Sequence, residues 1–129
     1  MNNNKYDIND SVEEKVNKYI RFCDVLEEYK DKYDNRDVNR ANAVARQLEK
    51  YSRALNEDPD AKEVYGRLLD SDNVVALIWA GTNCLRCGFW TERAEEILTR
   101  ISNVGIGVDA LNAKLTLAVW RGEFKNTTL

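Results

Sequence analysis

The stretch NVVALIWAGTNCLRCG, residues 73–88, decides how this chain folds. Its first residue, Asn73, is of a type that caps helix N-termini, and Gly88 can supply the left-handed cap that ends a helix. The stretch therefore predicts one helix over residues 73–87. Its first half is apolar at almost every position. Because a helix that is hydrophobic all round is buried, we expect this helix in the middle of an all-α protein.

Two longer helices are predicted before this stretch. Ser11 and Glu14 form a capping box that starts the first of them. Apolar residues then recur at steps of three and four, first over residues 12–33 and again over 38–55. We expect Asn35 or Asp37 to cap the second helix. Together the two predict a long antiparallel hairpin.

Three shorter helices complete the prediction. Asp58 before Pro59 is a good N-terminal cap for a third helix that starts near residue 59. Thr91 is expected to cap a fifth helix, and Asp109 a sixth that runs over about 110–121. Six helices with short loops predict a single domain, a HEAT-like α-solenoid of three antiparallel helix pairs. Its parts are a disordered lead-in at residues 1–9, the long hairpin at 10–56 and HEAT-like pairs at 57–124.

The second half of the chain carries a family resemblance, in residues 68–124. The matching elements are Leu-Leu-Asp at 68–70, Trp-Ala at 79–80, and a closing pattern that includes Trp120, Arg121 and Gly122. The stretch resembles a family of small bacterial HEAT-like proteins of unknown function, which implies a stack of helix pairs and no catalytic residues. In size, charge and architecture the chain also resembles helical immunity proteins of contact-dependent toxin systems.

Composition and charge exclude several classes of function. The net charge is −3, and residues 1–72 hold 13 Lys and Arg against 17 Asp and Glu. Such an acidic chain is a poor ligand for nucleic acid, whose phosphates are neutralised by Lys and Arg, and a better one for a basic protein. The polar first residues and the short apolar runs predict neither a secretory signal nor a membrane span, so we expect a cytoplasmic protein.

Catalytic and metal chemistry are not indicated. The chain has no histidine, which removes the commonest general base and the commonest metal ligand. Cys84 and Cys87 form a single Cys-x-x-Cys without a second pair, so we expect them to pack rather than bind zinc. We predict no enzyme activity, no cofactor and no metal.

Candidate partner-binding residues are of two kinds. Acidic residues follow the exposed side of the first helix and continue at the next helix boundary, and Trp90 follows Phe89 in a loop, where an aromatic residue can anchor an interface. Trp79 and Trp120 are expected in the core. The candidates are Asp24, Glu27, Glu28, Asp31, Asp34, Glu57, Asp58, Asp60 and Trp90.

These observations predict a protein-binding module, most concretely an immunity protein that covers the active site of a basic toxin, possibly a nuclease. One alternative is a HEAT-like scaffold or homo-oligomerising protein with no toxin partner. Another is a helical-repeat enzyme acting on nucleic acid, which the missing basic groove argues against. The sequence leaves the binding face and the oligomeric state open.

Overall fold

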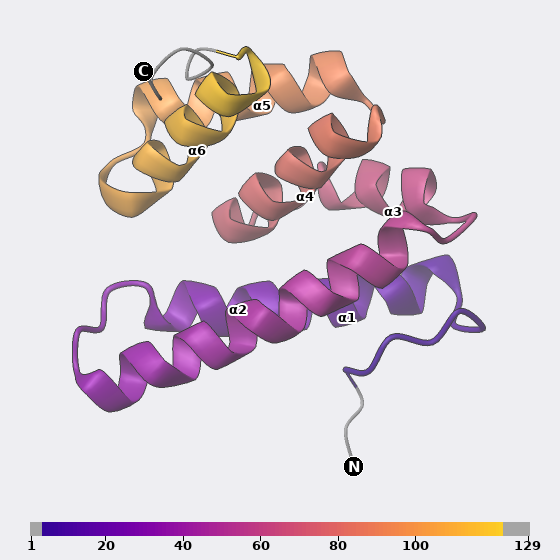
Figure 1. The fold of residues 1–129 in the computed structure, drawn as a ribbon, viewed down its shortest axis with the longest axis horizontal. Helices are drawn as coiled ribbons and strands as arrows, with labels where there is room; N and C mark the ends of the chain where they lie inside the picture. Colours follow the sequence, from indigo (N-terminus) through magenta and orange to yellow (C-terminus); the bar gives the residue numbers. More distant parts are fainter. Residues whose placement is uncertain (1–3, 123–129) are drawn as a thin grey trace.

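The computed structural model describes residues 4–122, and this part of the chain is all-helical, as predicted. Figure 1 shows α1 and α2 lying along one side of the molecule, with α4, α5 and α6 on the other and α3 at the end that joins them. The six helices are α1 (Val12–Tyr29), α2 (Asn35–Asn56), α3 (Ala61–Leu68), α4 (Val74–Cys87), α5 (Thr91–Val104) and α6 (Gly107–Trp120).

The central position of α4 is confirmed, because it packs against each of the other five helices. Its small buried residues allow this close approach. An added Cβ on Gly81 would lie 3.2 Å from Cγ of Leu98 in α5, so glycine lets these two helices meet. Asn73 and Gly88 bound α4 as predicted: the Asn73 side chain accepts from the Ala76 N–H, and Gly88 is left-handed with φ of 78°.

Several predicted helix boundaries are wrong. The first helix ends at Tyr29, not at residue 33: a turn follows, in which the Lys32 N–H donates to the Tyr29 carbonyl at 3.0 Å. Asp34 is extended, and its side chain accepts from the Arg36 N–H to cap α2. Asp58 does not cap α3, which begins at Ala61. Neither α5 nor α6 has a side-chain cap: α5 follows Trp90, and α6 starts two residues before Asp109.

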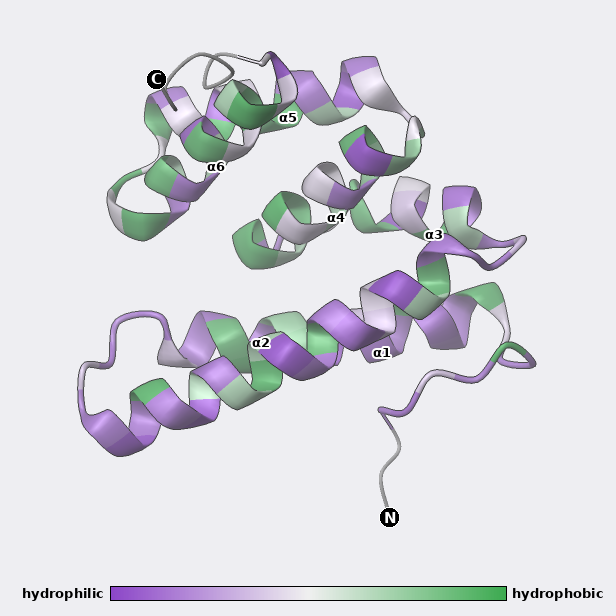
Figure 2. Cartoon of the chain, in the orientation of Figure 1, coloured by the Kyte–Doolittle hydropathy of each residue, from purple (hydrophilic) through white to green (hydrophobic). Residues whose placement is uncertain are grey.

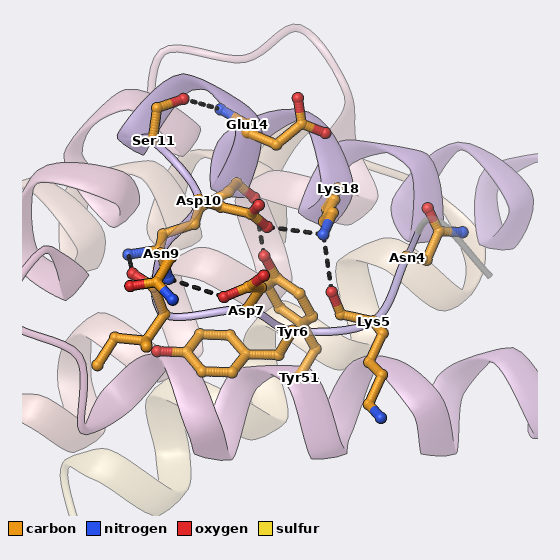
Figure 3. A network of polar contacts seen from close by, with 12 residues as sticks. Asn4, Lys5, Tyr6, Asp7, Asn9, Asp10, Ser11, Glu14, Lys18 and Tyr51 are labelled. Atoms are coloured by element: carbon orange, nitrogen blue, oxygen red, sulfur yellow. Dashed lines mark hydrogen bonds and ion pairs between the residues drawn. The ribbon is translucent and has the colours of Figure 1, made fainter. Parts of the chain in front are cut away.

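Residues 4–9, which the sequence predicts as part of a disordered lead-in, pack against the long helices; residues 1–3 lie outside the described part. The Tyr6 ring meets the Tyr51 ring edge-on at 5.5 Å. Lys18 Nζ donates to the Lys5 carbonyl at 2.8 Å and to Asp10 at 2.6 Å (Figure 3). The segment is held against α1 because two buried lysines of that helix donate to its backbone carbonyls: Lys15 donates to Ile8 and Lys18 donates to Lys5.

The most buried charge of the described residues lies under this segment. Lys15 is fully buried, and its Nζ lies 2.7 Å from Asp58 Oδ2 and 3.1 Å from Asp60 Oδ2. Tyr6 donates its hydroxyl to the same Asp58 carboxylate. We call Tyr6, Lys15, Asp58 and Asp60 the clasp. It joins the N-terminal segment, α1 and the α2–α3 connection, which are distant in sequence.

Between residues 4 and 122, the helices lack the combination of length and hydrophobicity that crossing a bilayer requires.

Candidate partner-binding surfaces

The carboxylates at the end of α1 form the first candidate surface. Glu28 and Asp31 are exposed, and neither takes part in an ion pair with residues 4–122. Asp24 is also exposed, and it accepts a hydrogen bond of 2.8 Å from the Asn73 amide at the start of α4. We call Asp24, Glu28 and Asp31 the acidic surface. These groups can meet a cation of another molecule.

Two of the predicted acidic residues, Glu27 and Asp34, already bind groups of their own chain. Glu27 lies 2.5 Å from Lys30, and Lys30 also reaches Asp109 of α6 at 2.8 Å. The hydrogen bonds to Asp109 and Glu27 raise the pKa of Lys30 above its ordinary value, so this lysine stays charged and ties α1 to α6. Asp34 is exposed, but its carboxylate caps α2. Both residues therefore have a structural role at this end of the molecule.

The residues at the α2–α3 boundary separate into exposed and buried ones. Glu57 is exposed at the C-terminal cap of α2. The Asp58 side chain, only 1% exposed, lies within the clasp, and Asp60 shares its lysine. The prediction that Asp58 binds a partner is therefore wrong, because a partner cannot reach this buried carboxylate. The boundary thus contributes less to an acidic surface than the sequence suggests.

Trp90 is partly exposed, but its ring is held by its own chain. Its Nε1 donates to the Lys62 carbonyl at 2.7 Å, and the ring lies so close to Gly66 that an added Cβ there would be 3.1 Å from Nε1. Lys62 Nζ lies 5.0 Å from the ring centroid. Trp90 also has a left-handed backbone, with φ of 50°, which a non-glycine residue adopts at some cost. It joins α3 to the turn before α5, and part of the ring remains accessible.

The cysteine pair lies in a setting that suits packing. Cys84 is fully buried, and burial raises the pKa of its thiol to about 12. Burial likewise raises the pKa of the half-buried Cys87 thiol. Neither thiol is in a disulfide. Because the thiolate is the nucleophile and the metal ligand, both groups are in their unreactive form at neutral pH.

The second candidate surface is an apolar one on α6 that the sequence analysis missed. Trp120, expected in the core, is 43% exposed, and most of the exposed large apolar residues of the described part lie close together along the chain. Figure 2 shows hydrophobic residues in green along α6, whereas α1 and α2 present mostly hydrophilic ones. The exposed group is Val104, Ile106, Val108, Leu111, Leu115, Val119 and Trp120.

A hollow of about 270 Å³ lies beside this apolar surface. Leu115, Thr116 and Val119 line it from α6, and Thr82, Leu85 and Arg86 line it from α4. Thr82 and Thr116 face each other at 3.3 Å between their hydroxyl oxygens. An adjoining hollow of about 290 Å³ extends towards Glu49 of α2. The surface therefore offers protruding apolar side chains next to a recess of matching chemistry.

Comparisons of the chain with protein families, with curated proteins and with solved structures find no match.

Proposed function

We propose that this protein is a protein-binding module, most concretely an immunity protein that binds a basic toxin such as a nuclease and covers its active site. The observation that carries the proposal is the acidic surface, where Glu28 and Asp31 are exposed and form no ion pair with residues 4–122. The proposal includes a cytoplasmic location and a HEAT-like stack of three antiparallel helix pairs. The packing of α1 on α2 and of α5 on α6 supports that stack, and α3 packs on α1 as well as on α4.

The mechanism is steric and electrostatic. A substrate site for nucleic acid is lined by cations, and exposed carboxylates attract such a site over a distance of about one Debye length, ~8–10 Å at physiological salt. This attraction speeds association and disfavours acidic or neutral partners. The accessible part of the Trp90 ring supplies an aromatic contact that slows dissociation. Once bound, the bulk of the helices blocks access to the toxin.

The partner is identified by capture from the native host. The tagged protein is used as bait at moderate salt, and the retained proteins are identified by mass spectrometry. A single stoichiometric, basic, toxin-like protein is the expected result. Recovery of the bait alone would favour the alternative, a scaffold or self-associating protein without a toxin, and would remove the toxin from the proposal.

Charge reversal on the acidic surface tests its role. We expect Glu28→Lys with Asp31→Lys to slow association with the captured partner about tenfold at low salt, and to abolish most of the salt dependence of the association rate. Both side chains are exposed, so the variant should keep its fold. Stopped-flow or biosensor kinetics at several salt concentrations measure the effect.

The matched control is Glu13→Lys with Glu92→Lys. It changes the net charge by the same amount at two exposed carboxylates in the first turns of α1 and α5. The control should associate at close to the wild-type rate. An equal slowing in both variants would assign the effect to total charge, and unchanged kinetics in the first variant would eliminate electrostatic steering.

A further inference from the structure

The helix α6 has apolar residues on two opposite sides. Its buried residues are Ala110, Ala113 and Leu117, which face α4 and α5. Each follows an exposed apolar residue by two positions, and two positions turn an α-helix through about 200°. The exposed residues, which we call the α6 stripe, are Val108, Leu111, Leu115 and Val119.

The α6 stripe is the core of a surface large enough for a stable contact. Its residues are 44–67% exposed, and Ile106 beside it is 88% exposed. Together with Val104 and Trp120 they expose an area on the order of 700 Å², close to the ~800 Å² that each partner contributes to a standard interface. Single exposed apolar residues need no explanation, but a contiguous patch of this size marks an interaction site.

Charge argues against the same partner binding here and on the acidic surface. The stripe itself is uncharged, and Lys114 and Asp109 are the charged residues of α6, with Asp109 already paired to Lys30. A basic protein gains no electrostatic advantage from this surface. The chemistry that suits it is a second uncharged, apolar helix face with small and branched side chains.

We infer that the α6 stripe is the interface of a homodimer, in which α6 of one copy packs against α6 of another. Most of the exposed large apolar residues within residues 4–122 lie at this surface. A second copy of the chain therefore supplies the uncharged, apolar helix face that the stripe requires. A two-fold contact places the same surface on both sides. The stripe residues of one copy then lie against the apolar hollow between α4 and α6 of the other, and both exposed surfaces are covered at once.

The spacing of the stripe fits such a contact. Steps of three and four residues, from Val108 to Leu111 to Leu115, are those of the apolar seam along which two helices pack. Val119, four residues further on, extends the seam by a turn. This inference does not rest on the proposed toxin, because it concerns the chain alone and a surface outside Asp24, Glu28 and Asp31.

The test is the solution mass of the full chain over a wide range of concentration, by light scattering and sedimentation equilibrium. We expect a mass approaching twice 14.9 kDa at high concentration. Leu115→Glu with Val119→Glu should give the monomer mass throughout. Leu115→Ala with Val119→Ala, which keeps good helix formers in α6, should weaken the dimer at least tenfold. Circular dichroism checks that each variant remains helical.

The control is Ile8→Glu with Tyr33→Glu, which changes two exposed apolar residues outside the α6 surface. It should dimerise like the wild type. A monomeric wild type at the highest concentration would overturn the inference, and so would a dimer that both stripe variants retain. A control that loses the dimer would show that the contact lies elsewhere. None of these outcomes bears on toxin capture, so the two proposals fail separately.

Discussion

Replacing Lys15 by methionine should lower the free energy of unfolding by about 3–5 kcal/mol, because it leaves the Asp58 carboxylate buried without its counter-charge. The ammonium is fully buried and also donates to the Ile8 carbonyl at 3.0 Å, so the N-terminal segment loses an attachment as well. Methionine retains most of the side-chain volume and keeps cavity formation small. Urea denaturation followed by circular dichroism gives the free energy.

A second variant separates the charge from the packing. Adding Asp58→Asn to Lys15→Met removes the uncompensated charge and keeps a side-chain oxygen for the Asp60 N–H, which now donates to Asp58 Oδ1 at 2.8 Å. The double variant should recover part of the lost stability. Arg67→Met, which breaks an exposed ion pair with Glu63, is the control and should change stability by less than about 1 kcal/mol. A Lys15→Met protein as stable as that control would contradict the assigned role of the clasp.

Acid should change the stability of the wild type and of Lys15→Met in opposite directions. Burial alone would raise the pKa of Asp58, but the hydrogen bonds from Lys15 and Tyr6 outweigh it and hold the pKa below its ordinary value. A lowered pKa gives stability that is present above about pH 4 and is lost as the pH falls further. Without Lys15, burial dominates and the pKa of Asp58 rises, so protonation relieves the destabilisation. The difference in unfolding free energy between wild type and Lys15→Met should therefore shrink between pH 7 and pH 4.

The parts of the fold that follow from local sequence were predictable. The span and the central place of α4 come from its apolar run and from the residues that bound it. The end of α1 was not predictable from periodicity, because Tyr33 continues the apolar spacing yet is 84% exposed. The chain leaves the helix at Tyr29 in a turn closed by the Lys32 N–H, and Asp34 then caps the next helix.

The candidate surfaces were less predictable, because they depend on which groups meet in space. Asp58 stands among other carboxylates in the sequence, and only the packing of α1 against the α2–α3 connection shows that it is buried against Lys15. The α6 stripe had a sequence signal, since apolar residues recur two positions before each buried one. The sequence cannot tell which of two apolar sides another helix covers.

The other large effect is expected at Asn83, which sits in the core with 2% of its surface exposed. Its Nδ2 donates to the Tyr19 hydroxyl at 3.3 Å and to the Trp79 carbonyl at 3.0 Å. Its Oδ1 accepts from the Asn56 amide at 3.1 Å, and Asn56 in turn accepts from Tyr65. The amide therefore links α4 to α1 and α2, and through Asn56 to α3. These bonds set how the two sides of the molecule in Figure 1 are held together.

Asn83→Leu should lower the free energy of unfolding by about 2–3 kcal/mol, because leucine has the same branched side-chain skeleton but leaves the Asn56 amide and the Tyr19 hydroxyl each short of a bond. Ser52→Ala is the matched comparison. It removes the other partner of the Tyr19 hydroxyl, at 2.9 Å, while Asn83 remains, so its cost should be nearer 1 kcal/mol. Urea denaturation measures both. If Asn83→Leu proved as stable as the wild type, hydrophobic packing alone would hold α4 against α1 and α2, and the polar network would be dispensable for the position of both surfaces.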